Sequence, residues 1–233
     1  MENNEVSLDS EAMAGNARTR ASFYSMINVH FITLPDLAFV TKIRSSEFSG
    51  TLKSLAADQA LPEELSAGAS LMSRFLDDNA SLTDTEISEK LGLDRTSLYR
   101  GLTPEISPPP PCEAVWSLTR PNVVELLQEL SGIYRQSGMG LDYDIGERLD
   151  YIGVELDYMR QLAEKEAEAW QKGDTDTAET MLERQGEFFM VHLNVWTESF
   201  IEKALSMAKT DFYRGHLTML RGFFAAEREG FQV

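Results

Sequence analysis

The sequence has one cysteine, Cys112, among its 233 residues. A single cysteine excludes an internal disulfide framework and any zinc site made of several cysteines. The chain also lacks an uninterrupted apolar run of about 18 residues, the length that a membrane-spanning helix needs. Its first residues are polar and acidic and contain no apolar stretch of the kind found in secretory signals. We therefore expect a cytoplasmic protein without stable membrane insertion.

Basic residues are scarce as well, with 21 Lys and Arg against 38 Asp and Glu and a net charge of −17 at pH 7. Phosphates require positive surface, so we expect no nucleic-acid partner. The negative charge is concentrated, because residues 142–187 hold fourteen acidic and five basic residues. This distribution favours a basic peptide or a basic protein surface as the partner, and a purely solubilising role of the same acids is the alternative.

Motifs for catalysis and for cofactor binding are missing from the sequence. There is no H-E-x-x-H, no Walker loop, no G-x-G-x-x-G and no G-x-S-x-G. A di-iron helical bundle requires Glu-x-x-His motifs. The residues that stand three positions before His30, His192 and His216 are Ile27, Phe189 and Tyr213. We expect no metal, no cofactor and a function in binding rather than catalysis, with His192 packed at the edge of a core.

Apolar residues recur at helical spacing along most of the chain, and alternating strand patterns are hard to find. Helices are predicted over 18–33, 36–43, 61–76, 121–136, 146–172 and 175–207, followed by a last helix in the C-terminal segment. In the longest of these, Phe189, Leu193, Trp196, Phe200 and Met207 form one stripe, which predicts core packing. The fold class is therefore all-α, a helical bundle.

Five prolines lie between Pro104 and Pro111. Proline lacks the amide donor and fixes φ, so this segment is predicted to be an extended loop, a hinge over about 102–112 that joins two helical parts. We expect residues 1–17 to be a flexible acidic N-terminus and residues 18–233 to form the helical domain. Such a hinge allows either a monomer or a domain-swapped dimer.

The segment 147–159 places two kinds of side chain on one predicted helix. Leu149, Ile152, Leu156 and Met159 recur at spacings of three and four and predict a core-facing stripe. Roughly opposite them stand Glu147, Asp150, Tyr151, Glu155 and Tyr158. Acids interleaved with tyrosines suit a partner that is basic and partly apolar, because charge guides the approach and aromatic area supplies affinity. A solvated helix face is the ordinary alternative.

The same segment resembles the signature of the TorD/DmsD/NarJ-like family of cytoplasmic chaperones that mature molybdenum-containing redox enzymes. That signature often reads Glu-Pro-x-Asp-His, then a hydrophobic run and Glu-Leu. Glu147, Asp150, Glu155 and Leu156 match it here. The proline is missing and Tyr151 replaces the histidine, so no role of that histidine is carried over.

Other segments resemble the family in the same order along the chain. LGLDRTSLYRGL is similar to Leu-x-x-Asp-x-Thr-x-Leu-Phe-x-Gly, with Tyr99 in the phenylalanine position. PPCEAVWSL is similar to Pro-Pro-Tyr-Glu-Ser-Val-Tyr and keeps Glu113 and Trp116 in pattern. FFMVHLNVWTESF resembles Phe-Leu-x-x-His-Leu-x-x-Trp-x-x-x-Phe, and DFYRGHLTMLRGFF matches more loosely. The resemblance covers roughly residues 91–224.

Two other functions remain open from the sequence. Residues 83–100 read as a helix-turn-helix, with Gly92 at the turn and residues 96–100 as the recognition helix of a transcriptional regulator. Their local net charge of −1, from four acids and three bases, argues against DNA. A generic helical adaptor is the third reading.

The resemblance implies a TorD-like fold and a chaperone of a molybdoenzyme precursor. Such a chaperone binds the precursor's twin-arginine signal peptide, assists cofactor insertion and delays export. Arginines of the peptide are expected to meet Glu147, Asp150 or Glu155, since guanidinium pairs bidentately with carboxylate. The full set of expected peptide-binding residues is Tyr99, Glu113, Trp116, Glu147, Asp150, Tyr151, Glu155 and Tyr158.

Overall fold

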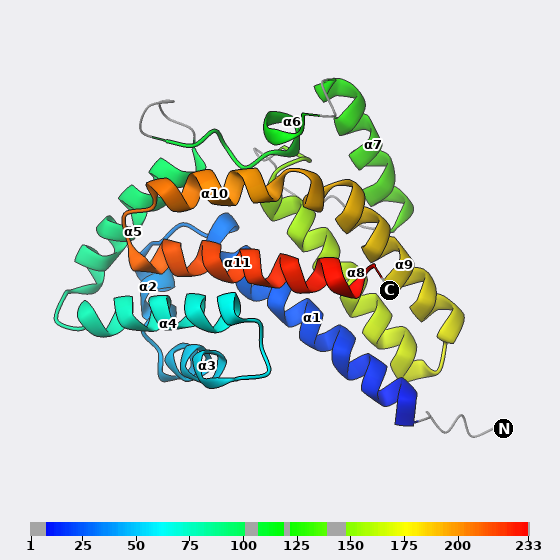
Figure 1. Cartoon of the computed structure of the whole chain (residues 1–233), viewed down its shortest axis with the longest axis horizontal. Helices are drawn as coiled ribbons and strands as arrows, with labels where there is room; N and C mark the ends of the chain where they lie inside the picture. The colour runs from blue at the N-terminus through cyan, green and yellow to red at the C-terminus, as the bar shows by residue number, and fades with distance from the viewer. Residues whose placement is uncertain (1–7, 101–106, 119–121, 139–147, 233) are drawn as a thin grey trace. The chain divides into compact units, whose positions relative to one another are not determined.

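The computed structural model describes residues 8–100, 107–118, 122–138 and 148–232, and the regular elements in these ranges are all helices (Figure 1). The all-α prediction is therefore confirmed. Pairing of β type in the same ranges is limited to one isolated antiparallel bridge between Cys112 and Tyr151. Among these helices none is long and apolar enough to cross a membrane.

The chain divides into two compact units, each made from two segments. Unit 1 comprises Met1–Val29 and Cys112–Val195, and unit 2 comprises His30–Pro111 and Trp196–Val233. One boundary follows the proline-rich segment, between Pro111 and Cys112. The chain also changes unit after Val29 and after Val195, so the units are not simply the N-terminal and C-terminal halves.

Unit 1 contains most of α1 (Leu8–Ile32), α6 (Glu113–Trp116), α7 (Val123–Gln136), α8 (Ile152–Lys172), α9 (Thr175–Val191) and the 3-10 turn η1 (Leu193–Val195). Helices α8 and α9 pack against each other as a hairpin (Figure 1). Gly173 ends α8 with a φ of 70°, a left-handed conformation that glycine adopts without strain. The Asp174 side chain then caps α9 by accepting from the Thr177 amide.

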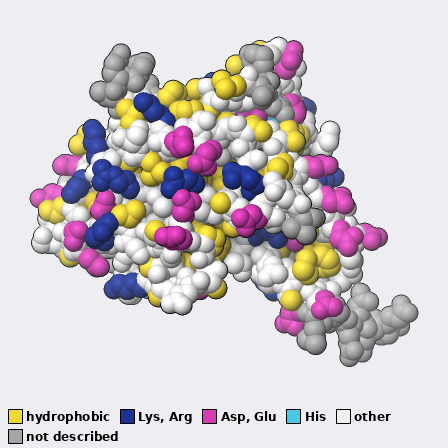
Figure 2. Space-filling model, viewed as in Figure 1, with side chains coloured by type: hydrophobic (Ala, Val, Ile, Leu, Met, Phe, Trp, Pro, Cys, Tyr) yellow, Lys and Arg dark blue, Asp and Glu magenta, His cyan; other side chains and the backbone are white. Residues whose placement is uncertain are grey.

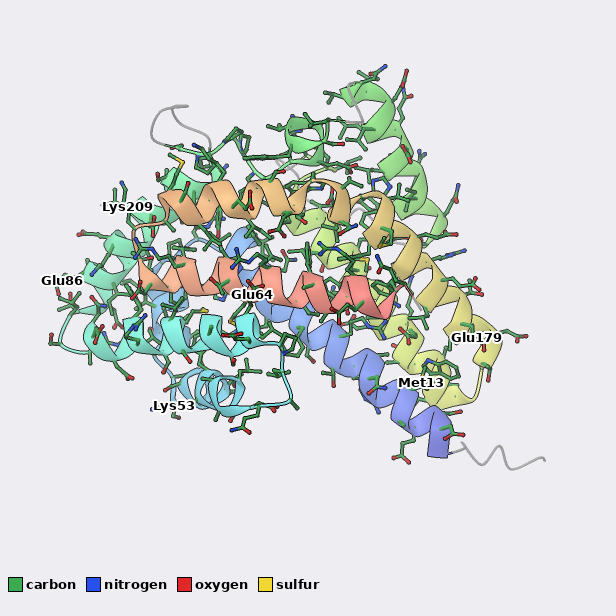
Figure 3. The ribbon with its side chains drawn as sticks, viewed as in Figure 1. Met13, Lys53, Glu64, Glu86, Glu179 and Lys209 are labelled. Carbon is green, nitrogen blue, oxygen red and sulfur yellow. The ribbon has the colours of Figure 1, made fainter. Side chains whose placement is uncertain are left out.

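A buried carboxylate joins three helices of unit 1. Glu166 of α8 is 0% exposed and accepts hydrogen bonds from Trp170 Nε1 at 3.2 Å and from Gln185 Nε2 of α9 at 2.8 Å. Its Oε2 also lies 3.5 Å from Nη1 of Arg20 in α1. Beside this network, Met13, which is labelled in Figure 3, packs on a cluster of Ala14, Ala169, Trp170 and Ala178.

Unit 2 contains α2 (Leu37–Ile43), α3 (Ser46–Ala57), α4 (Glu63–Asp78), α5 (Asp84–Tyr99), α10 (Thr197–Met207) and α11 (Asp211–Gly230). Helices α4 and α11 approach closely because glycine faces glycine at the crossing. A Cβ placed on Gly215 would lie 2.5 Å from the Gly68 carbonyl oxygen. At the edge of the same contact, Glu64, labelled in Figure 3, pairs with Arg221 at 2.6 Å.

The interior of unit 2 is rich in aromatic rings. His30 and His216 lie with ring centroids 4.8 Å apart, and both are at most 2% exposed. The rings of Phe39, Phe48 and Phe212 stand edge-on to His30. Tyr99 of α5 bonds to His216 Nδ1 at 3.0 Å. These contacts make a largely apolar cage around the two imidazoles.

Several predicted helix boundaries are wrong. Helix α1 begins at Leu8 rather than at residue 18, because the small residues Ala14 and Ala17 pack there fully buried and give little apolar signal. Helix α3 was not predicted at all, and Leu52 is its only fully buried side chain. The helix predicted over 175–207 is broken by η1, although Leu193 and Trp196 remain in the core as expected.

The helix-turn-helix interpretation of residues 83–100 is wrong. Helix α5 runs without interruption from Asp84 to Tyr99, and Gly92 lies inside it. Thr83 and Glu86 form a capping box at its start. The helix therefore begins directly after Thr83 and has no turn at Gly92. Within the supposed recognition helix Leu98 and Tyr99 are buried in the core, whereas a recognition helix must expose its side chains.

Candidate functional site

The family-like segments at 112–116 and 148–151 meet in unit 1 through Asp150. The Asp150 carboxylate is 0% exposed and accepts from the Ala114 amide at 3.0 Å. Arg148 donates two hydrogen bonds to it, from Nε at 2.8 Å and from Nη2 at 2.7 Å. These hydrogen bonds raise the pKa of the Arg148 guanidinium. Asp150 therefore fixes the start of α6 next to the start of α8 and is not available to an incoming arginine.

Glu113, the first residue of α6, forms a buried carboxylate and imidazole pair with His192. His192 Nδ1 lies 2.9 Å from Glu113 Oε2, and both side chains are at most 1% exposed. Since the carboxylate accepts, we assign the proton to Nδ1. His192 also stacks on Phe188, with centroids 4.6 Å apart and planes at 29°. The imidazole is thus held in one orientation.

His192 lines a pocket that lies entirely within unit 1. Its cavity volume is about 390 Å³. Helices α7, α8 and α9 supply the walls, with Glu129, Ile133, Gln136, Ser137, Tyr158, Arg184, Glu187, Phe188, Val191 and His192 as lining residues. The pocket combines two carboxylates and one guanidinium with an aromatic floor. Figure 2 shows further acidic side chains along the edge that α9 forms.

Several contacts fix the position of Tyr158 in the pocket lining. Tyr158 packs edge-on against Phe188, with ring centroids 4.6 Å apart, and in a tilted arrangement against Tyr134, with centroids 5.0 Å apart. Its hydroxyl shares a 2.8 Å hydrogen bond with Ser137 Oγ, and burial raises the pKa of this phenol. The Lys165 ammonium donates to the Ser137 carbonyl and so ties α8 to the end of α7. Each polar group at the floor is therefore oriented by its neighbours.

The structure places the eight expected site residues in different surroundings. Tyr158 lines the pocket, Glu113 supports His192, and Asp150 and Tyr151 lie in the segment before α8. Glu155 is buried in the first turn of α8, and Trp116 is half-buried in α6. Tyr99 lies in unit 2, and Glu147 lies outside the described residues.

The expectation of a solvent-facing acidic and aromatic face on residues 147–159 is wrong. Helix α8 begins at Ile152, so Asp150 and Tyr151 precede it and do not share a helical face with Glu155. The side chains of Glu155 and Tyr158 are buried together with those of the apolar stripe. This first half of α8 is surrounded, since Asn28 of α1 donates to the Gly153 carbonyl and α9 packs along its length.

Sequence reasoning missed the charged residues of the pocket. Glu129 and Ile133 follow each other by one turn on α7, and Glu187 and Val191 do so on α9. The weak signal for α9 is the acid repeat Glu179, Glu183 and Glu187 at intervals of four, all exposed. Nothing in either helix alone indicates that the two pairs line one pocket.

The described residues form an all-helical protein with a pocket in unit 1, and among them no group of three His, Cys, Asp or Glu side chains is arranged to hold a metal. Residues 58–202, more than half of the chain, match the nitrate reductase delta subunit family, and the chain belongs to this family. Its members are TorD-like chaperones that mature molybdenum redox enzymes of the nitrate reductase type. No curated protein matches the chain.

Proposed function

We propose that this chain is a cytoplasmic chaperone that binds the twin-arginine signal peptide and the precursor of a molybdenum-containing oxidoreductase. It assists cofactor insertion and delays export until insertion is complete. The work is done by binding, because the peptide has to be shielded rather than changed. Family membership supports the chaperone class, and the signal peptide is our more specific proposal.

The observation that carries the proposal is the pocket of unit 1. Its lining contains carboxylates from α7 and α9 together with Tyr158, on a chain whose net charge is −17. Opposite charge speeds the encounter with a basic peptide, and a partly desolvated carboxylate binds guanidinium through paired hydrogen bonds. The family-like segments at 112–116 and 148–151 lie in the same unit and position its helices.

The expected binding residues enter the proposal with distinct roles. Tyr158 contacts the peptide, and Trp116 offers half-exposed aromatic surface beside it in the chain segment of α6. Glu113 orients the imidazole and Asp150 joins α6 to the start of α8, while Tyr151 and Glu155 lie buried at the start of α8. Glu147 and Tyr99 stay in the proposal as further contacts of the peptide or the precursor.

Calorimetry with a synthetic twin-arginine signal peptide tests the proposal. We expect binding that weakens about tenfold or more, a loss of about 1.4 kcal/mol, when both arginines are replaced by lysine. The lysine peptide is the matched control because it keeps the charge and loses only the planar fork. Equal binding of both peptides, or no binding by several signal peptides of molybdoenzymes, would contradict the proposal.

A further inference from the structure

Four large aliphatic side chains of unit 2 are exposed near one another. Ile32, Leu34, Leu37 and Leu93 are each more than half exposed, and Leu93 reaches 76%. We call these four residues the aliphatic patch. The first three lie between the last residue of α1 and the first residue of α2, and Leu93 lies on α5. Single exposed aliphatic residues are ordinary, whereas several in one place mark a surface that a partner covers.

Contacts of α5 bring the residues of the aliphatic patch together. Ser88 donates to the Pro35 carbonyl at 2.6 Å, and a Cβ placed on Gly92 would lie 3.9 Å from Cγ of Pro35. Helix α2 also packs on α5. Leu34 precedes Pro35 in the chain and Leu93 follows Gly92, so both leucines lie beside this contact.

Arg95, three residues after Gly92 on the same face of α5, is buried without an acidic partner. It is 5% exposed, and its Nη2 donates to the Phe31 carbonyl in the last turn of α1. The guanidinium carbon lies 5.9 Å from the centre of the Tyr99 ring. Among the described residues, no acid forms an ion pair with Arg95, and its buried Nε has no hydrogen-bond partner.

The unpaired guanidinium indicates the chemistry of the missing partner. Guanidinium has five N–H donors, and a buried donor without an acceptor is costly. The Phe31 carbonyl and the negative end of the α1 dipole compensate the charge only in part. A carboxylate supplies the missing negative charge and accepts from the remaining donors. Because Arg95 is largely shielded from water, this pairing is stronger than it is at an open surface.

We propose that the aliphatic patch and Arg95 form a docking surface for a segment of a partner protein that carries apolar side chains and one carboxylate. The apolar side chains cover the patch, and the carboxylate pairs with Arg95. Four side chains are too few for a second copy of the chain, since a stable interface takes about 20–30 residues a side. A polyanion fits poorly, because the chain has a net charge of −17. The surface belongs to unit 2 alone and does not depend on the proposed peptide binding in unit 1.

A pair of small probes tests the docking surface. Hexanoate carries a carboxylate on a short apolar chain, and hexanamide is its uncharged match. Each is titrated into the full chain while NMR follows the Nε–H signal of Arg95 and the methyl signals of Leu34, Leu37 and Leu93. We expect hexanoate to shift these signals to saturation. Hexanamide should bind about tenfold more weakly, because it lacks the charge that strengthens the hydrogen bonds.

Matched variants test the two parts of the surface separately. Arg95→Gln should weaken hexanoate binding about tenfold, whereas Arg100→Gln, an exposed position at the end of the same helix, should change it less than about twofold. Leu93→Ala removes exposed apolar area without disturbing a buried group and should weaken binding about threefold. Val124→Ala in α7 of unit 1, where the side chain is 63% exposed, is its control. Thermal unfolding verifies that each variant folds, and the leucine pair decides if Arg95→Gln does not.

Three results would overturn the docking surface. The first is the absence of a saturable shift with hexanoate, which would mean that solvent alone satisfies Arg95. The second is equal binding of hexanoate and hexanamide, or control variants that weaken binding as much as Arg95→Gln and Leu93→Ala do. The third is broadening of the leucine signals with rising protein concentration, together with the mass of a dimer in light scattering, which would assign the aliphatic patch to a second copy of the chain.

Discussion

The interiors of the two units differ in the side chains that they bury. Unit 1 buries the carboxylates of Glu113, Asp150, Glu155 and Glu166, each of them 0% exposed. Unit 2 also buries a carboxylate, that of Asp94, which accepts from the amides of Lys209 and Thr210. Around His30, however, its interior consists of phenylalanine rings, and glycine joins α4 to α11. Buried carboxylates cost desolvation and are retained where they orient other groups. Among the described residues, unit 1 therefore buries more carboxylates than unit 2 does, and unit 2 has a tighter helix crossing at its glycines.

His192 of unit 1 and His30 of unit 2 also have different surroundings. In unit 1 the Glu113 carboxylate bonds to Nδ1 of His192, and His192 lines the pocket. In unit 2 the His30 imidazole is enclosed, and burial is the main cause that lowers its pKa well below 6.5, with His216 and Lys42 adding to the effect. One imidazole pairs with a carboxylate beside a pocket, and the other is enclosed in an aromatic core.

The largest expected effect is loss of the buried carboxylate network of unit 1. Glu166→Ala leaves the donors of Trp170, Gln185 and Arg20 without their acceptor, so the free energy of unfolding should fall by about 3–5 kcal/mol. Denaturant unfolding measures it. Glu168→Ala on the same helix is the control, because Glu168 is 68% exposed and its pair with Lys172 should contribute under about 1 kcal/mol. Equal effects would remove the distinction between a structural and a solvated acid.

Two glycine substitutions, one in each unit, test how tightly the helices pack. Gly215→Ala in unit 2 brings a methyl group within 2.5 Å of the Gly68 carbonyl oxygen, and α4 and α11 must separate. We expect a loss of about 1–3 kcal/mol in the free energy of unfolding. Gly132→Ala in α7 of unit 1 meets nothing within 4 Å and should instead gain about 0.5–1 kcal/mol from lower backbone entropy. Opposite signs in denaturant unfolding support the tight crossing, and a gain in both variants argues against it.

The histidine cage predicts sensitivity to acid. The unfolded state binds a proton on His30 near pH 6.5, whereas the folded state does so only at lower pH. The contribution to stability is therefore complete above pH 6.5 and is lost as the pH falls from 6.5 toward the lowered pKa, by up to about 1.4 kcal/mol per pH unit. His30→Phe should flatten this slope between pH 5 and 6.5, measured by unfolding across the range. An unchanged slope would assign it to other groups.

The sequence predicted the positions of the helices better than the tertiary contacts that they make. Periodicity found α2, α4, α7 and the turn at Gly173, because an apolar stripe and a helix terminus are local properties. It placed Asp150 and Glu155 on the helix face opposite the core stripe. It could not predict their burial, because that depends on partners distant in the sequence. The amide that bonds to Asp150 belongs to Ala114, 36 positions away. The pocket has the same origin, since Glu129 and Glu187 come from helices that no local pattern brings together.

The smallest expected effect concerns an ion pair of unit 2 at its surface. Arg221 and Glu64 lie 2.6 Å apart, with side chains 32% and 38% exposed. Exposed pairs contribute about 0–1 kcal/mol, because water already solvates both charges and salt screens them. Arg221→Gln should therefore lower the free energy of unfolding by less than about 1 kcal/mol, and less again at high salt. In unit 1, Arg148→Gln leaves the fully buried Asp150 without its guanidinium and should cost more. If the two substitutions cost the same, burial of the carboxylate is not what distinguishes the interiors of the units.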